Sequence, residues 1–327
     1  MRMQSCFNVL ISLALLCIGA LAQENSSANP TANVNVKSQI ASADYLGQIP
    51  PGVTPEVFAP GVVSIDGRTA ERISFSPDGK ESFFSVTSPD YSAPFKIYHS
   101  TRGTDGTWSS PTLADFSGSY WDGASAFSPD GKRLFFVSNR PYPGQMKNFR
   151  SLWYIEKRGD AWSQPQFLSR AFVQPYDMSY VSASANGNIY FIGYERDISG
   201  KTISRTIYKS RYVNGEYQQP ESLNAQLHGD KAGFSDPYIA PDESFLLFNR
   251  NVNKCISFHR NDDSWTEPIA IEDRLSSIPG LKWAMSLSPD MKFLFFTNLP
   301  GPTSVKGYIY WIKADFIAAL MDGVTPK

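Results

Sequence analysis

Apolar residues in this chain gather in short runs, and each run follows a tight turn. In one such run, Ser128-Pro-Asp-Gly131 precedes the apolar segment Leu134-Phe-Phe-Val137. The proline presets φ for a type I turn, the aspartate can bond its own backbone, and the glycine accepts a positive φ. The pattern therefore predicts a β-hairpin whose turn leads into an extended strand.

Five copies of this unit follow one another along the chain. They begin at positions 76, 128, 184, 240 and 288, so successive copies are 52, 56, 56 and 48 residues apart. Each is followed by an aromatic strand and a third strand, and this length is that of a four-stranded propeller blade. We therefore expect an all-β fold, a closed β-propeller with five four-stranded blades, whereas six blades would need a degenerate unit within residues 23–70. The turn segments are Ser76-Pro-Asp-Gly79, Ser128-Pro-Asp-Gly131, Ser184-Ala-Asn-Gly187, Ala240-Pro-Asp-Glu243 and Ser288-Pro-Asp-Met291.

An aromatic residue three positions before a proline predicts the fourth strand of a blade, because proline in a sheet belongs on an edge strand. Four units contain this pattern, at Trp108 to Pro111, Trp162 to Pro165, Tyr217 to Pro220 and Trp265 to Pro268. The fifth unit lacks it, and Pro55-Glu-Val-Phe-Ala-Pro60 supplies a similar segment before the first turn. We expect this N-terminal strand to complete the last blade, which removes free sheet edges. Residues 314–321 predict a short C-terminal helix.

The Ser-Pro-Asp-Gly-Lys runs, the aromatic strands and the polar-Arg strand ends, such as Asn139-Arg140, resemble the WD40-like (PD40) repeat of TolB-type propellers. The resemblance covers nearly all of the chain after Tyr45 and implies a fold rather than an activity. We expect no TolB-like N-terminal domain before Tyr45, and the Gly-x-Ser-x-Gly elbow of prolyl-oligopeptidase-type enzymes is absent. Glu243 and Met291 stand where glycine would tolerate a positive φ, at a cost of about 1 kcal/mol each.

The N-terminal residues predict export. Arg2 precedes an apolar run too short to span a membrane, and Ala20-Leu-Ala22 ends it with the small-x-small pattern of a cleavage site. We expect a signal peptide over residues 1–22, a disordered leader over 23–44 and a single propeller domain over 45–327, located outside the cell or in the periplasm. Leu16 before Cys17 does not fit a lipoprotein anchor, so no membrane span or anchor is expected in the mature chain.

The net charge and the cysteine content argue against a nucleic-acid partner and against a disulfide. The net charge of −1 gives no electrostatic footprint for nucleic acid. Cleavage would leave Cys255 as the sole thiol, which predicts a small buried side chain and no disulfide. No metal-ligand spacing or phosphate-binding loop occurs, so we expect no metal site and no cofactor.

The turn motif joins strands one and two, so the starts of strand one and the ends of strand two meet the opposite face. A rigid scaffold there can fix a site, and the mixture of carboxylates, guanidinium groups and aromatic rings suits a saccharide or a peptide. An alternative is that the repeated Arg and Asp residues pair with each other and tie the blades together. The ligand-binding candidates are Glu71, Arg72, Trp121, Asp122, Arg140, Tyr180, Arg196, Asp236, Arg250 and Trp283.

Catalytic candidates come from the same face. His228 lies in a loop that breaks the repeat, beside Asp230 and Lys231, and a histidine can act as a general acid or base near neutrality. Asp230 or Asp236 would orient it. The carboxylates that could act with it are Asp122, Asp177 and Asp236.

Three hypotheses of function follow, and the sequence leaves open whether the protein is an enzyme. The first is an exported propeller that binds a saccharide or peptide in the central funnel. The second is a carbohydrate-active hydrolase or lyase that uses funnel carboxylates with His228, and arginines that lock those carboxylates would argue against it. The third is a protein-interaction platform in an envelope assembly, which predicts an exposed apolar patch.

Overall fold

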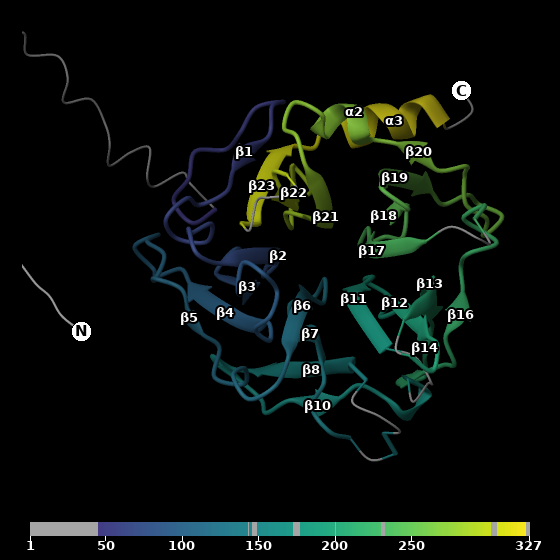
Figure 1. Ribbon diagram of the computed structural model, residues 1–327, viewed down its shortest axis with the longest axis horizontal. Coiled ribbons are helices and arrows are strands. Elements are labelled where there is room, and N and C mark those ends of the chain that lie inside the picture. Colours follow the sequence, from purple (N-terminus) through teal and green to yellow (C-terminus); the bar gives the residue numbers. More distant parts are fainter. Residues whose placement is uncertain are drawn as a thin grey trace, which may run out of the picture. The chain divides into compact units, whose positions relative to one another are not determined.

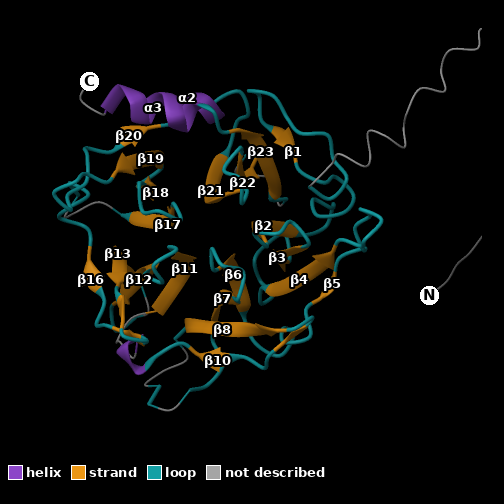
Figure 2. Cartoon of the chain, turned by 180° about the vertical axis from the view of Figure 1, so that it is seen from behind, coloured by secondary structure: helices purple, strands orange, loops and turns teal. Residues whose placement is uncertain are grey.

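The computed structural model describes residues 45–142, 144–145, 149–172, 177–199, 201–229, 233–301 and 306–324. In this part of the chain, strands form five four-stranded sheets set around a central axis, as Figures 1 and 2 show. The predicted all-β propeller of five blades is confirmed. The expected signal peptide and leader, residues 1–44, lie outside the described residues.

Within each blade the strands are paired in antiparallel fashion from the axis outward. Blades 1 to 4 take their strands in chain order. Blade 2 carries an extra short strand, β9 (Ala161–Trp162), and β14 (Tyr212–Val213) pairs with β15 (Glu216–Tyr217) beside blade 3. The strands of blades 1 and 2 are β2 (Thr69–Phe75), β3 (Glu81–Thr87), β4 (Lys96–Thr101) and β5 (Thr112–Leu113), then β6 (Asp122–Phe127), β7 (Arg133–Ser138), β8 (Ser151–Arg158) and β10 (Gln166–Phe167).

The remaining blades follow the same plan. A 3-10 turn (Arg170–Phe172) precedes blade 3, and α2 (Glu272–Leu275) precedes blade 5. The strands of blades 3, 4 and 5 are β11 (Asp177–Ala183), β12 (Ile189–Arg196), β13 (Thr202–Ser210) and β16 (Glu221–Ser222), then β17 (Phe234–Ile239), β18 (Phe245–Arg250), β19 (Asn253–Phe258) and β20 (Ile269–Ala270), then β21 (Leu281–Leu287), β22 (Phe293–Leu299), β23 (Tyr308–Lys313) and β1 (Glu56–Val57).

The N-terminal strand closes the ring, as expected. Glu56 of β1 pairs with Trp311 of β23, and the Phe58 N–H donates to the carbonyl oxygen of Ile309 at 2.8 Å. Blade 5 therefore combines three strands from the end of the chain with one from its beginning, and no outer strand of its own is needed. The expected C-terminal helix is α3 (Phe316–Val324), which follows β23 directly.

The predicted outer strands begin slightly later than the sequence indicated. The aromatic residue pairs with the end of the third strand, as Trp162 does with Lys157 and Trp265 does with His259. The proline then interrupts the ladder, and the true fourth strand starts just after it, for example at Gln166 after Pro165. Proline removes a backbone donor, so it divides each outer edge into two short pieces.

The turn motifs have the conformation that their residues demand. In blade 1, Ser76 Oγ donates to Asp78 Oδ1 at 2.6 Å and accepts the Glu81 N–H at 2.9 Å. Glu243 and Met291 adopt φ values of 61° and 58°, the left-handed region expected at these two positions. The motif thus acts as a corner that sets the register of each blade.

Aromatic side chains from neighbouring blades form the core between them. Between blades 5 and 1, Phe58 and Trp311 are fully buried, with ring centroids 5.0 Å apart. Tyr45 joins this cluster through Phe75, at 5.3 Å. Burying each large apolar side chain contributes about 1.5–3 kcal/mol, so such clusters hold the blades against one another without a disulfide.

The first strands of the five blades contact one another in a closed ring around the axis. Each carries a bulge in its pairing with the second strand, next to a residue with positive φ. A non-glycine residue in this conformation costs about 1 kcal/mol, and such strain is concentrated at functional sites. The five equivalent residues are Arg72 (47°), Ala124 (51°), Tyr180 (49°), Asp236 (55°) and Ala284 (56°).

Candidate functional site

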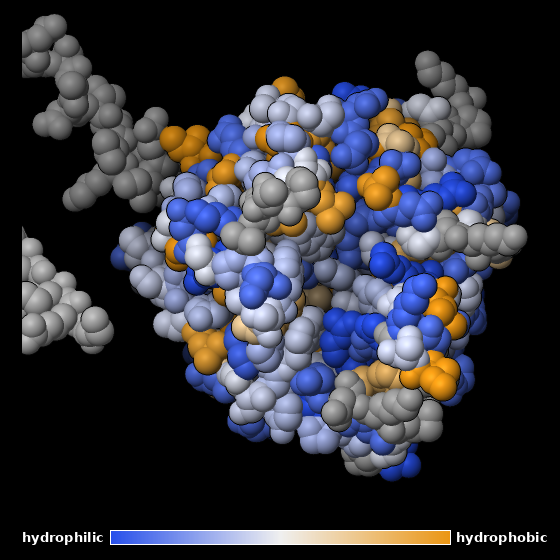
Figure 3. Space-filling model, in the orientation of Figure 1, coloured by the Kyte–Doolittle hydropathy of each residue, from blue (hydrophilic) through white to orange (hydrophobic). Residues whose placement is uncertain are grey.

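A cavity of about 390 Å³ lies at the face where first strands begin and second strands end. Figure 3 shows the molecule hollowed near its centre, where the five blades meet. Six aromatic rings, one carboxylate and one guanidinium group line the cavity, and Leu281 and Leu299 lie at its edge in blade 5. The lining residues are Glu71, Tyr91, Phe95, Trp121, Arg150, Ser179, Tyr180, Tyr194, Leu281, Trp283 and Leu299.

Glu71 is the carboxylate of this cavity, and its side chain is held from two other blades. The Tyr180 hydroxyl of blade 3 donates to Glu71 Oε1 at 2.6 Å, and Trp283 Nε1 of blade 5 donates to Oε2 at 3.0 Å. Burial raises the pKa of Glu71 despite these two hydrogen bonds. The Glu71 carboxyl group therefore has a fixed position among aromatic rings. It can accept hydrogen bonds when ionised and act as an acid when protonated.

Asp236 occupies the equivalent bulge in blade 4 and is not among the residues that line this cavity. Its Oδ2 accepts hydrogen bonds from Asn249 Nδ2 at 2.6 Å and from the Ala284 N–H at 3.2 Å. Burial, aided by the nearby charge of Glu71, raises the pKa of Asp236 to about 7. Two buried carboxyl groups therefore share the axis, and neither forms an ion pair with an arginine among the described residues.

Arg150 forms the cationic wall of the cavity and is fixed by Asp177. Its Nε donates to Asp177 Oδ1 at 2.9 Å and its Nη2 to Oδ2 at 2.5 Å, while Arg196 Nη2 contacts Oδ2 at 2.9 Å. Burial alone would raise the pKa of Asp177, but the hydrogen bonds from both arginines hold it below its usual value. This triad joins blade 2 to blade 3.

The Arg150 guanidinium lies over the Trp121 ring, 4.7 Å from its centroid, and Phe95 packs beside that ring at 5.1 Å. Gly123 permits this arrangement, because a Cβ there would come within 3.1 Å of the indole. Trp121 is thus an indole platform of fixed orientation at the cavity wall.

Asp122 and Arg140, two of the predicted binding residues, pair with each other. Arg140 Nη2 donates to Asp122 Oδ1 at 2.9 Å, and Ser117 Oγ donates to Oδ2 at 3.1 Å. Asp122 has no exposed surface, and neither residue lines the axial cavity. Asp122 and Arg140 therefore pair with each other, as in the alternative interpretation, but within one blade and not between blades.

His228 and Arg250 lie away from the axial cavity. His228 Nδ1 is 2.9 Å from Glu267 Oε1, and Arg250 Nη2 donates to the carbonyl oxygen of His228 at 2.6 Å. The His228 side chain faces solvent and does not contact Asp236. Asp230 and Lys231, its expected neighbours, lie outside the described residues.

Arg72 occupies the axis but lines a different cavity, at the opposite end of the channel. Its side chain is 1% exposed, and its Nη2 donates to the carbonyl oxygens of Val181 at 3.2 Å and Pro237 at 3.5 Å. Burial lowers its pKa.

Of the predicted set, the axial cavity therefore brings together Glu71, Trp121, Tyr180 and Trp283. Asp236 is not in its lining, and Arg196 donates to the same Asp177 carboxylate as Arg150. Sequence reasoning did not select Arg150 or the rings of Tyr91, Phe95 and Tyr194. Arg150 precedes the third strand of its blade, whereas the predicted residues were taken from the starts of first strands and the ends of second strands. Two of these residues could have been found from their place in the repeat. Arg150 directly precedes the third strand of blade 2, and Phe95 directly precedes the third strand of blade 1.

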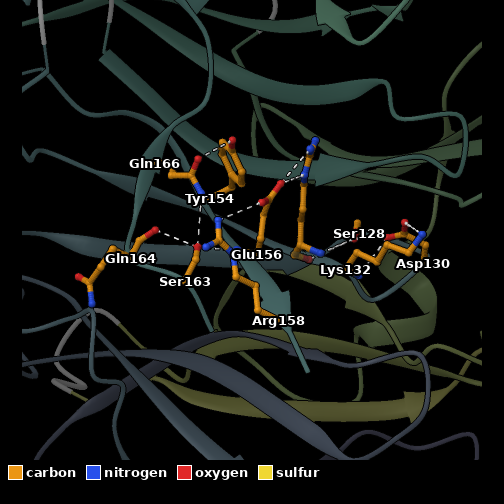
Figure 4. Close-up of polar contacts among 10 residues, drawn as sticks. Ser128, Asp130, Lys132, Tyr154, Glu156, Arg158, Ser163, Gln164 and Gln166 are labelled. Atoms are coloured by element: carbon orange, nitrogen blue, oxygen red, sulfur yellow. Dashed lines mark hydrogen bonds and ion pairs between the residues drawn. The ribbon is translucent and has the colours of Figure 1, made fainter. Parts of the chain in front are cut away.

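A larger cavity, of about 470 Å³, lies between blades 2 and 3 on the turn face. Its charged side chains already have partners: Arg133 Nη2 donates to Glu156 Oε1 at 3.1 Å, and Lys132 Nζ is 3.8 Å from Asp130 Oδ2. Figure 4 shows the polar contacts of Glu156 continuing through Ser163. The charged side chains of this cavity are already paired and are not free for a ligand. We therefore place the candidate site in the axial cavity.

Two structural features are absent from the described residues. No group of three or more His, Cys, Asp or Glu side chains there is arranged to hold a metal ion. None of the helices in these ranges is long and apolar enough to cross a membrane. Cys255 is buried, and burial raises the pKa of its thiol.

No protein-family model matches the chain, and no curated protein matches it. Among solved structures, the periplasmic gluconolactonase of Pseudomonas aeruginosa aligns with a TM-score of 0.40 and 15% identity, over 73% of this chain and 70% of that one. A protein of unknown function from Dyadobacter fermentans gives 0.48 and 12%, over 81% and 83%. A Hadza microbial sialidase gives 0.45 and 15%, over 76% of this chain and 56% of that one. Similarity at this level bears on neither activity nor ligand.

Proposed function

We propose that the axial cavity binds a saccharide and that the protein is an exported saccharide-binding propeller. The observation that carries the proposal is the ring of six aromatic side chains around the buried carboxylate of Glu71. Aromatic faces pack against the apolar C–H face of a pyranose, and a fixed carboxylate accepts hydrogen bonds from its hydroxyl groups. A volume of about 390 Å³ is within the range of pockets that enclose small molecules.

Each polar group has a distinct role in this proposal. Glu71 accepts from sugar hydroxyls with its remaining lone pairs, since each of its oxygens holds one protein donor. Arg150 donates from Nη1, because Nε and Nη2 are occupied by Asp177. The Trp121 ring, packed against Phe95 and Arg150, forms a fixed part of the cavity wall that the sugar contacts.

Calorimetric titration of the protein with monosaccharides, uronic acids and disaccharides tests the proposal, with short peptides as the competing class. We expect Trp121→Ala to weaken saccharide binding at least tenfold, which corresponds to about 1.4 kcal/mol. Trp283→Phe keeps the ring but removes the donor to Glu71 Oε2, and we expect a smaller loss. Peptide binding without saccharide binding would overturn the saccharide class.

Trp108→Ala is the matched control for Trp121→Ala. Trp108 is also half-buried, but it pairs with Arg102 on the outer side of blade 1 and does not line the cavity. We expect this variant to bind like the wild type. If both tryptophan variants lose binding equally, the loss reflects general damage to the fold, and the axial assignment fails.

A second candidate function, hydrolysis of a glycosidic bond, rests on the raised pKa values of Glu71 and Asp236. A carboxyl group kept protonated near neutral pH can act as a general acid, and Glu71 lines the cavity where substrate would lie. Asp122 and Asp177 are excluded from this role because arginines hold them. Hydrolysis of aryl glycosides that Glu71→Gln abolishes, and that Glu156→Gln leaves unchanged, would favour catalysis over binding alone.

Export through residues 1–22 is part of the proposal and rests on the sequence alone. N-terminal sequencing of the protein recovered from its native compartment should begin at Gln23. A mature chain that starts at Met1 would remove the export assignment without affecting the axial site.

A further inference from the structure

The axial channel has a second end, on the face that carries the turn motifs. A cavity of about 240 Å³ opens there, separate from the saccharide cavity proposed above. Its mouth is formed by prolines of four turn motifs, and its walls are largely apolar, with Phe75, Phe127 and Leu287 among them. The prolines are Pro77, Pro129, Pro241 and Pro289.

A buried cation lines this cavity. Arg72 is 1% exposed, yet its Nε and Nη1 have no hydrogen-bond partner among the described residues. Only Nη2 is engaged, by the carbonyl oxygens of Val181 and Pro237. A buried guanidinium with two unpaired donors is costly, because each lost hydrogen bond to water must be replaced. Such a group calls for an acceptor that the described residues do not supply.

A second donor faces the same space. Ser74 Oγ is buried and has no hydrogen-bond partner among the described residues, and Ser74 lines the cavity two positions after Arg72 on β2. The equivalent residues of blades 3 and 5 differ, since Ser182 Oγ accepts the Ile239 N–H at 3.1 Å and Ser286 Oγ donates to a backbone carbonyl at 2.7 Å. Of the three serines at these equivalent positions, Ser74 is the one without a partner in the described part of the chain. Two unsatisfied polar side chains, Arg72 and Ser74, therefore line the same cavity.

Asp236, an acidic residue whose charge acts on Arg72, is already engaged elsewhere. Asp236 accepts from Asn249 and from the Ala284 N–H, and it forms no ion pair with Arg72 within 4.0 Å. An anion that enters from the turn face would therefore reach a guanidinium with free donors. Its non-polar part would lie against the phenylalanine, leucine and proline side chains of the cavity.

We propose that this end of the channel binds a small organic carboxylate with an apolar substituent, held by Arg72 and Ser74. The charged head takes the two unpaired donors of Arg72 and the Ser74 hydroxyl, and the substituent fills the apolar walls. A strongly hydrated inorganic anion such as phosphate gains little from those walls, so it binds more weakly than a carboxylate of the same charge density. This site opens on the face opposite the proposed saccharide cavity and shares no lining residue with it.

Benzoate is the probe, and benzamide is its neutral isostere. In thermal unfolding of the full mature chain at constant ionic strength, we expect benzoate to raise the melting temperature by several degrees and benzamide to leave it unchanged, since a ligand of the folded state stabilises it. Sodium phosphate should give a smaller shift than benzoate. Arg72→Met should abolish the benzoate shift.

Arg133→Met is the matched control, because Arg133 lies on the same face but is paired with Glu156. It should keep the full response. Ser74→Val provides a second variant that retains Arg72 and should weaken benzoate binding several-fold, so the test holds even where Arg72→Met does not fold. Crystals soaked in 4-bromobenzoate should show bromine at the turn-face end of the channel.

Three outcomes overturn the proposal. Equal responses to benzoate and benzamide show that the cavity holds water around Arg72 and no anion. A benzoate shift that persists in Arg72→Met, or that is as large in Ser74→Val as in the wild type, places the ligand elsewhere. Bromine in the Trp121 cavity instead assigns carboxylate binding to the opposite face. Loss of saccharide binding in Trp121→Ala should leave the benzoate response intact, which keeps the two sites distinguishable.

Discussion

The Tyr180 hydroxyl donates a 2.6 Å hydrogen bond to Glu71 Oε1 across the axis of the propeller. Tyr180 belongs to blade 3 and Glu71 to blade 1, which are not neighbours, so the bond spans the channel rather than a blade boundary. Tyr180 is in the left-handed conformation, and burial raises the pKa of its hydroxyl well above the usual value. The pair is therefore a neutral phenol that donates to a buried carboxyl.

Tyr180→Phe removes the donor and leaves Glu71 with one hydrogen bond, from Trp283. An unsatisfied buried acceptor costs about 1–3 kcal/mol, so we expect a loss of that size in the free energy of unfolding, measured with urea. Tyr154→Phe is the control, since its hydroxyl contacts Gln166 at 3.1 Å near the surface and should cost under about 1 kcal/mol. Equal losses in both variants would show that Glu71 does not depend on this bond.

Asp236 should make stability fall as pH rises. Its pKa is raised from 3.8 in the unfolded chain to about 7 in the fold, so its contribution is fully present below pH 3.8 and lost as pH rises through 7. Asp236→Asn keeps a neutral side chain at every pH. We expect this variant to match the wild type near pH 4 and to have the higher melting temperature at pH 8.5.

The opposite order at pH 8.5 would contradict this prediction. It would mean that the Asp236 carboxylate is stabilised by Arg72, whose charge lowers the pKa of Asp236 in opposition to burial. Asp130→Asn is a useful comparison, because Asp130 lies on the exposed turn face. Hydrogen bonds from Ser128 and Lys132, working against burial, lower the pKa of Asp130, so its pH dependence has the other sign.

The repeat allowed the architecture to be predicted because its corner residues are local. Ser, Pro, Asp and Gly specify a turn through their own backbone preferences, so Ser76 and its equivalents set the blade count and register without tertiary information. The same register correctly indicated that Pro55 to Pro60 would close the ring. The predicted start of each outer strand was less accurate. Whether a proline such as Pro165 interrupts the hydrogen-bond ladder depends on which neighbouring strand its backbone faces, and the repeat does not specify this.

The residues of the candidate site were harder to predict from the repeat than the architecture was. The distance of a residue from the turn motif indicates that it lies near the axis but not which end of the channel it faces. Glu71 and Arg72 are adjacent yet line opposite cavities. Which arginine pairs with which aspartate is a tertiary property. Arg150 holds Asp177 from another blade, and no pattern within either repeat specifies that contact.

The triad of Asp177, Arg150 and Arg196 should be a principal tie between blades 2 and 3. Asp177→Asn leaves two partly buried guanidinium groups without their counter-charge, and breaking a buried pair costs about 3–5 kcal/mol. Urea unfolding measures this loss. Asp263→Asn, which removes an exposed partner of His259, should change stability by less than about 1 kcal/mol. A small effect at Asp177 would assign blade cohesion to the aromatic clusters alone.

Glu81 ties blades 1 and 2 and should confer stability that acid removes. His99 Nε2 lies 3.2 Å from Glu81 Oε1, Trp162 Nε1 donates to the same oxygen at 3.1 Å, and Lys157 contacts Oε2. Although burial acts in the opposite direction, these contacts lower the pKa of Glu81 from 4.5 to about 2. The stabilisation is therefore present above pH 4.5 and lost as pH falls toward 2.

We expect Glu81→Gln to be about 1–3 kcal/mol less stable than the wild type at pH 7, with the difference in stability closing below pH 3. A gap that stays constant from pH 7 to pH 2.5 would show that packing of the side chain, rather than its charge, supplies the stability.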